Sequence, residues 1–134
     1  MAYTGKPDYS EHAQFDYRVR QSDYDATEKQ LEKLREKNPE ISIHISDYFN
    51  ALLGGEIYPL TIVSDRYGGV YSGASFTAWP LDWLQVPEDI DGCDPECSDF
   101  WSSFKGICGK GASPQEAYDD LCKKIIEAID SIEI

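Results

Sequence analysis

The sequence has no Lys or Arg between Arg66 and Lys105, although the chain carries 12 basic and 25 acidic residues. It also has only two histidines, one methionine and no hydrophobic run long enough to form a membrane helix. Neither histidine has a neighbouring nucleophile, and no lysine follows the glycine pairs in the manner of a phosphate-binding loop. Residues 1–10 contain no apolar signal segment. These absences predict a non-catalytic cytoplasmic protein whose four cysteines are thiols.

The excess of acidic residues gives a net charge of -13 and an isoelectric point near 4.3. Such a charge repels the phosphates of nucleic acids and of anionic membranes, so it disfavours direct binding to either. It favours a basic protein as the partner, including one whose own function is to grip nucleic acid. We expect no cofactor, and a homodimer is left open.

The cation-free window combines acidic residues with all three tryptophans, Trp79, Trp83 and Trp101. Acidic runs alone usually form solvated tails, and aromatic residues alone usually form core. Together they predict a folded negative surface anchored by indoles, with Trp83 and Leu84 partly exposed. The residues predicted to bind a basic partner are Asp82, Trp83, Glu88, Asp89, Asp91, Asp94, Glu96, Asp99 and Trp101.

The sequence contains ligand residues for two kinds of metal site. The acids at 88–99 resemble a calcium loop in composition, but they lack the alternation and the terminal glutamate of an EF-hand. A four-thiolate zinc site would use Cys93, Cys97, Cys108 and Cys122, whose spacings match no common zinc ribbon. We therefore favour buried cysteines that act as small hydrophobes, plus one loop pair at Cys93 and Cys97, and we assign no metal. In an exported protein that pair could instead be oxidised.

The length predicts a single α+β domain over residues 1–134. Its first part is a loose arm at 1–14 followed by a β-α-β unit at 15–55. In that unit, alternation predicts strands at Phe15–Arg20 and Ile41–Ile45, with a short helix over 47–53. The helix between the strands is expected to begin at a capping Asp23 or Asp25 and to end at Lys37.

The second part, residues 56–134, predicts an antiparallel sheet packed against a C-terminal helix. A hairpin is expected from strands at 57–63 and 70–79, followed by an acidic insertion at 80–99 and a third strand at 100–108. Ser113, Pro114 and Glu116 form the signature of a capped helix. Its helical spacing predicts burial of Leu121, Ile125 and Ile129 against the sheet.

Residues 56–130 resemble the HicB-like antitoxin fold. The resemblance rests on the pattern G-x-x-x-x-G-x-[ST]-x-x-E-A, formed by Gly106, Gly111, Ser113, Glu116 and Ala117. The hairpin opening at 58–62 is similar to the start of that family. The resemblance implies a strand-strand-strand-helix order and a non-enzymatic binding role. The chain differs in its acidic insertion and in its additional N-terminal unit.

We therefore expect a protein that neutralises a basic, nucleic-acid-handling protein. Its size and charge are similar to those of phage and mobile-element counter-defence proteins of the anti-CRISPR or anti-restriction type. A HicB-type antitoxin is the close variant. Two other classes are a small-ligand binder or enzyme that uses Asp65, Tyr67 and the glycine-rich junction at 109–111, and a module stapled by a metal through the cysteines.

Overall fold

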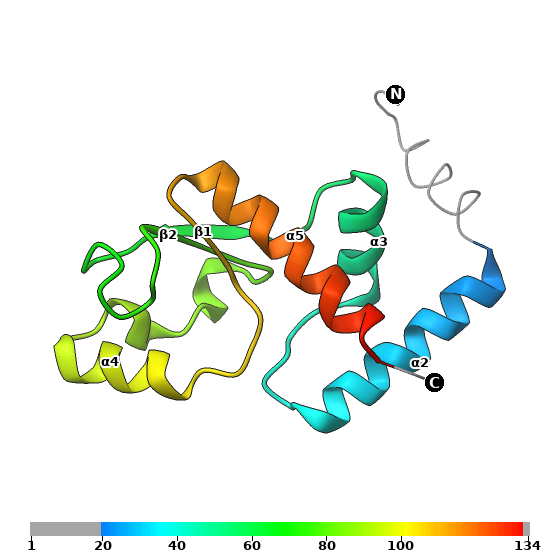
Figure 1. The fold of residues 1–134 in the computed structure, drawn as a ribbon, viewed down its shortest axis with the longest axis horizontal. Helices are drawn as coiled ribbons and strands as arrows, with labels where there is room; N and C mark the ends of the chain where they lie inside the picture. The colour runs from blue at the N-terminus through cyan, green and yellow to red at the C-terminus, as the bar shows by residue number, and fades with distance from the viewer. Residues whose placement is uncertain (1–19, 133–134) are drawn as a thin grey trace.

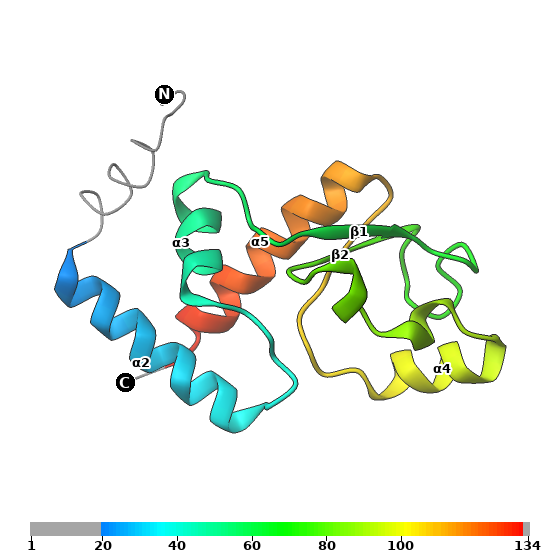
Figure 2. The same cartoon turned by 180° about the vertical axis from the view of Figure 1, so that it is seen from behind.

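The computed structural model describes residues 20–132. Helix α2 (Gln21–Lys37) lies at one end of an elongated molecule and helix α4 (Asp94–Ser103) lies at the other (Figures 1 and 2). Helix α5 (Pro114–Asp130) crosses between them and packs on the sheet and on α2 and α3. The remaining elements are α3 (Ile45–Leu53), β1 (Thr61–Ser64), β2 (Phe76–Trp79), the 3-10 helices η1 (Trp83–Gln85) and η2 (Glu88–Asp91), and β3 (Gly109–Gly111).

The N-terminal unit differs from the prediction. The strand predicted at Ile41–Ile45 is wrong, because residues 41–44 join no sheet and Ile45 begins α3. The alternation still holds for burial, because Ile41 and Ile43 are buried while Ser42 and His44 are exposed. The pattern therefore indicated which side chains are buried, but not that the segment pairs with a strand. Helix α2 begins at Gln21 with Arg20 as its N-cap, rather than at an aspartate. The predicted arm at 1–14 lies outside the described residues, as does nearly all of the strand predicted at Phe15–Arg20.

Asp47 lies in the first turn of α3 and is almost fully buried. Its Oδ2 accepts a hydrogen bond from the His44 backbone N–H at 2.9 Å, whereas its Oδ1 has no partner among the described residues. Burial raises the pKa of Asp47, and the hydrogen bond from His44 and the nearby His44 side chain offset only part of that effect. The charged form of this carboxyl is therefore disfavoured in the folded protein.

Asp47→Asn is expected to stabilise the protein at pH 7 by about 1 kcal/mol, because it keeps the acceptor for His44 and removes a buried charge. A carboxyl whose pKa is raised by folding contributes stability below its unfolded pKa, and this contribution is lost as pH rises through the folded pKa. The gain should therefore grow between pH 4 and pH 7. Urea unfolding of both proteins across this range measures it, and a gain that shrinks as pH rises would contradict the assignment.

The sheet is antiparallel with the order β1-β2-β3. Thr61 pairs with Trp79 and Ser64 with Phe76, while Phe76 also pairs with Gly111 on the other side. The predicted hairpin is confirmed, but its strands are shorter than expected and a loop at 65–75 joins them. The fold class is confirmed as α+β, with the sheet packed against the C-terminal helix.

The third strand was predicted in the wrong place. Residues 100–103 are the last turn of α4, and the strand is Gly109–Gly111. The aromatic residues that indicated a strand, Phe100, Trp101 and Phe104, are spaced to share one side of a helix and its end. They pack on Trp79 with ring centroids 5.5 to 6.4 Å apart. Contact with a distant tryptophan therefore overrides the local β-propensity.

Helix α5 agrees with its prediction. The Ser113 side chain accepts a hydrogen bond from the Glu116 backbone N–H at 3.2 Å, and Pro114 occupies the first helical position. Glu116 returns a bond to the N–H of Ala112 rather than to that of Ser113. The helix has 17 residues, which is about 4.7 turns. Leu121, Ile125 and Ile129 are fully buried.

The two faces of the sheet support two separate cores. On β2, Phe76 and Ala78 pack into the first core, with α2, α3 and α5, while Trp79 packs into the second. The same alternation on β1 assigns Ile62 to the first core and Val63 to the second. Ile90 of η2 and the aromatic residues of α4 complete the second core. The acidic insertion therefore folds as a layer over one face of the sheet.

Candidate functional site

The acidic insertion at 80–99 forms three consecutive helical pieces, η1, η2 and the start of α4, rather than an open connection. A local hydrogen bond marks the start of η1 and another marks the start of α4. Asp82 N–H donates to the Gln85 side chain at the start of η1, and Cys93 N–H donates to Glu96 Oε1 at the start of α4. Pro95 stands in the first turn of α4, where its missing N–H costs nothing. The segment thus presents its side chains from an ordered backbone.

All seven carboxylates predicted for partner binding are exposed. Six of them gather on η2 and α4, and we call this set the acidic end. It consists of Glu88, Asp89, Asp91, Asp94, Glu96 and Asp99. Between residues 20 and 132 the structure has two ion pairs, Arg20–Asp23 and Lys124–Asp120, and neither involves the acidic end.

Two of these carboxylates have structural roles that the sequence did not reveal. Glu96 caps α4, and Asp94 Oδ1 accepts a hydrogen bond from the Tyr71 hydroxyl at 3.0 Å. Both also lie in the first turn of α4, where the helix dipole favours negative charge. Local groups thus partly compensate the charges of these two carboxylates, whereas the side chains of Glu88, Asp89, Asp91 and Asp99 take part in none of these contacts.

The loop at 65–75 holds the acidic end in place. The Arg66 guanidinium donates to the carbonyl oxygens of Asp91, at 2.9 Å, and Gly92, at 3.3 Å. The Tyr67 hydroxyl donates to the Gly92 carbonyl oxygen at 2.7 Å. Sequence reasoning missed this role, although Arg66 is the last cation before the acidic window. Arg66, at the edge of the acidic window, thus donates to backbone carbonyl oxygens and not to the carboxylates.

The three tryptophans occupy different environments. Trp79 is 2% exposed and lies in the second core, with its indole N–H bonded to Thr77. Trp101 is half-buried beside it, and the Lys110 ammonium lies 5.0 Å from its ring centroid. Trp83 is 70% exposed and its neighbour Leu84 is 75% exposed. Of the two tryptophans predicted to bind a partner, Trp83 is the accessible one.

The four cysteines are free and differ in exposure. Cys93 is exposed and N-caps α4, while Cys97 is buried inside that helix, so the pair does not lie in a loop. Burial raises the pKa of Cys108 to about 11 and also raises the pKa of Cys97 and Cys122. In the part of the chain that the structure describes, no three Cys, His, Asp or Glu residues are grouped to hold a metal ion.

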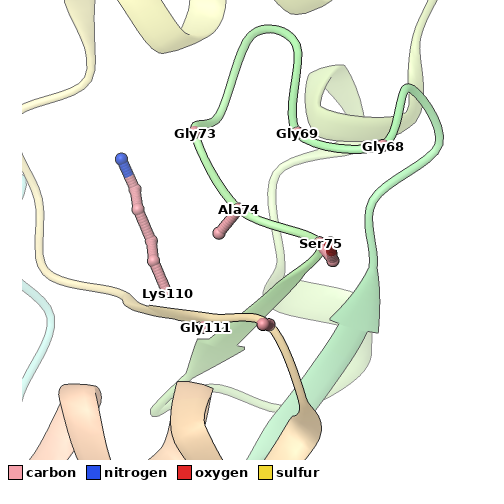
Figure 3. A pocket seen from close by; sticks show the side chains of 8 residues that line it. Gly68, Gly69, Gly73, Ala74, Ser75, Lys110 and Gly111 are labelled. Carbon is pink, nitrogen blue, oxygen red and sulfur yellow. The ribbon is translucent and has the colours of Figure 1, made fainter.

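A cavity of about 310 Å³ lies between the loop at 65–75 and β3. Figure 3 shows Lys110 extending from β3 toward Gly73, past Ala74. Asp65 and Tyr67, the two side chains of the alternative small-ligand site, do not line this cavity. The Asp65 carboxylate instead accepts a bond from Gly69 N–H, and Tyr67 contacts Gly92. Both side chains are therefore engaged in contacts outside the lining of this cavity.

No protein-family model, curated protein or solved structure matches this chain. The resemblance of residues 56–130 to HicB-like antitoxins therefore stays a prediction. Among the described residues, no helix has both the length and the apolar character needed to cross a bilayer.

Proposed function

We propose that this protein is a non-catalytic binding protein that neutralises a basic, nucleic-acid-handling protein. The acidic end is the observation that carries this proposal. It combines six exposed carboxylates with a backbone fixed by the second core and by Arg66 and Tyr67. Like charges held together repel one another, and a partner that supplies cations would relieve this repulsion.

Counter-defence is the most concrete form of this function. A rigid acidic surface can compete with phosphates for the basic groove of a nuclease or another nucleic-acid-binding effector. The net charge of -13 on a chain of 134 residues supports an inhibitor of this kind, because it speeds association with a positively charged protein. The expected activity is stoichiometric inhibition of the effector rather than turnover.

A HicB-type antitoxin is the second candidate. It is favoured by the order β1-β2-β3-α5 and by the close packing of Gly111 on α5, which belongs to the pattern carrying the resemblance. An antitoxin would protect cells from the toxic product of an adjacent gene. Co-expression with each neighbouring gene separates the two candidates, because a counter-defence inhibitor would rescue no neighbour's toxicity.

Reversing three charges of the acidic end, with Glu88→Lys, Asp89→Lys and Asp99→Lys, is expected to weaken partner binding at least tenfold at low salt. The carboxylates chosen are exposed and have no structural hydrogen bond, so the fold should be retained. The loss should shrink as salt rises, because exposed charges act over a distance that ions screen. The measurement is calorimetric binding to the basic protein captured from host lysate, at two salt concentrations.

The matched control reverses three exposed glutamates on α2, with Glu28→Lys, Glu32→Lys and Glu36→Lys. Each reversal adds two charges, so both triple variants have a net charge of -7. Helix α2 lies at the far end of the molecule from α4 (Figure 1), so this variant should bind like the wild type. Equal weakening in both variants would mean that net charge alone, and not the acidic end, attracts the partner.

A further inference from the structure

Three exposed apolar side chains lie at the open end of the β1–β2 hairpin. Tyr58 is 85% exposed, and Trp83 and Leu84 are 70% and 75% exposed. Antiparallel pairing of Thr61 with Trp79 brings the segment before β1 beside the segment after β2. The Thr61 hydroxyl joins them by donating to the Leu81 carbonyl oxygen at 2.8 Å. The segment that carries Tyr58 therefore adjoins the same end of the hairpin as the segment that carries Trp83 and Leu84, although the two segments are far apart in sequence.

The charged residues nearest to these side chains along the chain are acidic. Glu56, two residues before Tyr58, and Asp82, directly before Trp83, are both exposed. The two segments that supply the residues, 38–65 and 67–104, contain no Lys or Arg. We call the set the hairpin-end patch, and it consists of Glu56, Tyr58, Asp82, Trp83 and Leu84. It combines exposed apolar side chains with exposed carboxylates, which suits a cationic side chain that has an apolar or planar body.

We propose that the hairpin-end patch binds an arginine-bearing segment of the basic partner; this inference rests on the proposed function. A guanidinium is planar and weakly hydrated, so it stacks on an exposed indole and pairs with a carboxylate through two parallel hydrogen bonds. A lysine ammonium is a strongly hydrated point charge that gains less from such a surface. The patch therefore selects arginine over lysine.

The protein already contains one arrangement of this kind. The Arg66 guanidinium carbon lies 5.2 Å from the ring centroid of Tyr67, while its nitrogens donate to the Asp91 and Gly92 carbonyl oxygens. Stacking and hydrogen bonding thus act on the same guanidinium in this fold. The two segments that supply the hairpin-end patch contain aromatic and acidic residues but no arginine.

The patch and the acidic end have separable effects on binding. Exposed charges at the acidic end steer the partner and mainly raise the rate of association. An aromatic residue that becomes desolvated on binding mainly slows dissociation. The choice between arginine and lysine is therefore expected to depend on Trp83 and not on the carboxylates of η2 and α4.

The test compares two synthetic peptides of equal length and charge, one with arginines and one with lysines at the same positions. Calorimetry at physiological salt should show about fivefold tighter binding of the arginine peptide, the range expected for one exposed cation–π contact. Trp83→Leu keeps apolar area and removes the ring, so it should abolish the preference. The control is Val70→Ser, which changes an apolar side chain that is 75% exposed in the loop at the other end of the hairpin. It should leave the preference unchanged.

Equal affinity of the wild type for the two peptides would overturn this inference, and so would a preference that survives Trp83→Leu. Neither result touches the proposed function, which is tested by the charge reversals at the acidic end. Conversely, if those reversals change nothing but the arginine preference depends on Trp83, the patch is a binding site and the acidic end is not.

Discussion

Gly109→Ala is expected to destabilise the protein by about 3 kcal/mol or more, because β3 has no room for a side chain against α5. A Cβ built at Gly109 would lie 1.9 Å from the Ala117 carbonyl oxygen and 2.5 Å from the Leu121 backbone nitrogen. Both atoms belong to the backbone of α5, so no rotamer change can relieve the clash. The strand must instead move away from the helix, which breaks the packing that joins the sheet to the first core.

The movement would also disrupt two hydrogen bonds that join α5 to β3 and to Cys108, the residue before it. Asp120 Oδ2 accepts from the Lys110 backbone N–H at 2.8 Å, and the Lys124 ammonium donates to the Cys108 carbonyl oxygen at 3.1 Å. Burial opposes the charge of Asp120, but the bonds from Lys124 and Lys110 more than offset it, so its pKa is lowered. The close approach of β3 to α5 is thus what allows these polar contacts.

The control for Gly109→Ala is Gly68→Ala. Gly68 has a φ of +64° and open space where a Cβ would lie, so alanine there should cost only about 1–2 kcal/mol from backbone conformation. Urea unfolding of the two variants measures the difference directly. Similar losses in both would show that Gly109 contributes backbone freedom and that its close approach to α5 is not limiting.

Trp79→Ala is expected to cost about 3–5 kcal/mol and to release α4 from the sheet. Trp79 is 2% exposed and contacts Phe100, Trp101 and Phe104, the side chains that hold α4 in the second core. Its removal leaves a large cavity between that helix and β2. Since three of the six carboxylates of the acidic end are on α4, partner binding should weaken together with stability.

Trp83→Ala is the matched control for this change. The same side chain is removed, but from a position that is 70% exposed, so stability should change by no more than about 0.5 kcal/mol. Thermal unfolding measures both variants, and amide hydrogen exchange reports whether α4 opens in Trp79→Ala. If Trp83→Ala lost as much stability as Trp79→Ala, the division of the tryptophans between core and surface would be wrong.

The parts of the fold that sequence reasoning predicted correctly depend on local signals. Ser113 and Pro114 favour the start of a helix whatever the tertiary contacts around them. The spacing of Leu121, Ile125 and Ile129 then defines the buried face of that helix. Long-range contacts decided the parts that were wrong. Ile41 and Ile43 alternate as in a strand, but within residues 20–132 no strand pairs with them. Phe100 and Trp101 favour a strand locally, yet they become helical by packing on Trp79.

For the candidate site, the sequence by itself determined the sign of the charge and the exposure of the carboxylates, because ionised side chains are rarely buried without a partner. Only the tertiary structure decided which tryptophan is accessible, which loop holds η2 and α4, and that the segment before β1 lies beside the segment after β2. These features come from strand register and from packing across the sheet. Strand register and packing bring together residues that are far apart along the chain and follow no helical or strand period. Composition and local spacing therefore could not predict these features.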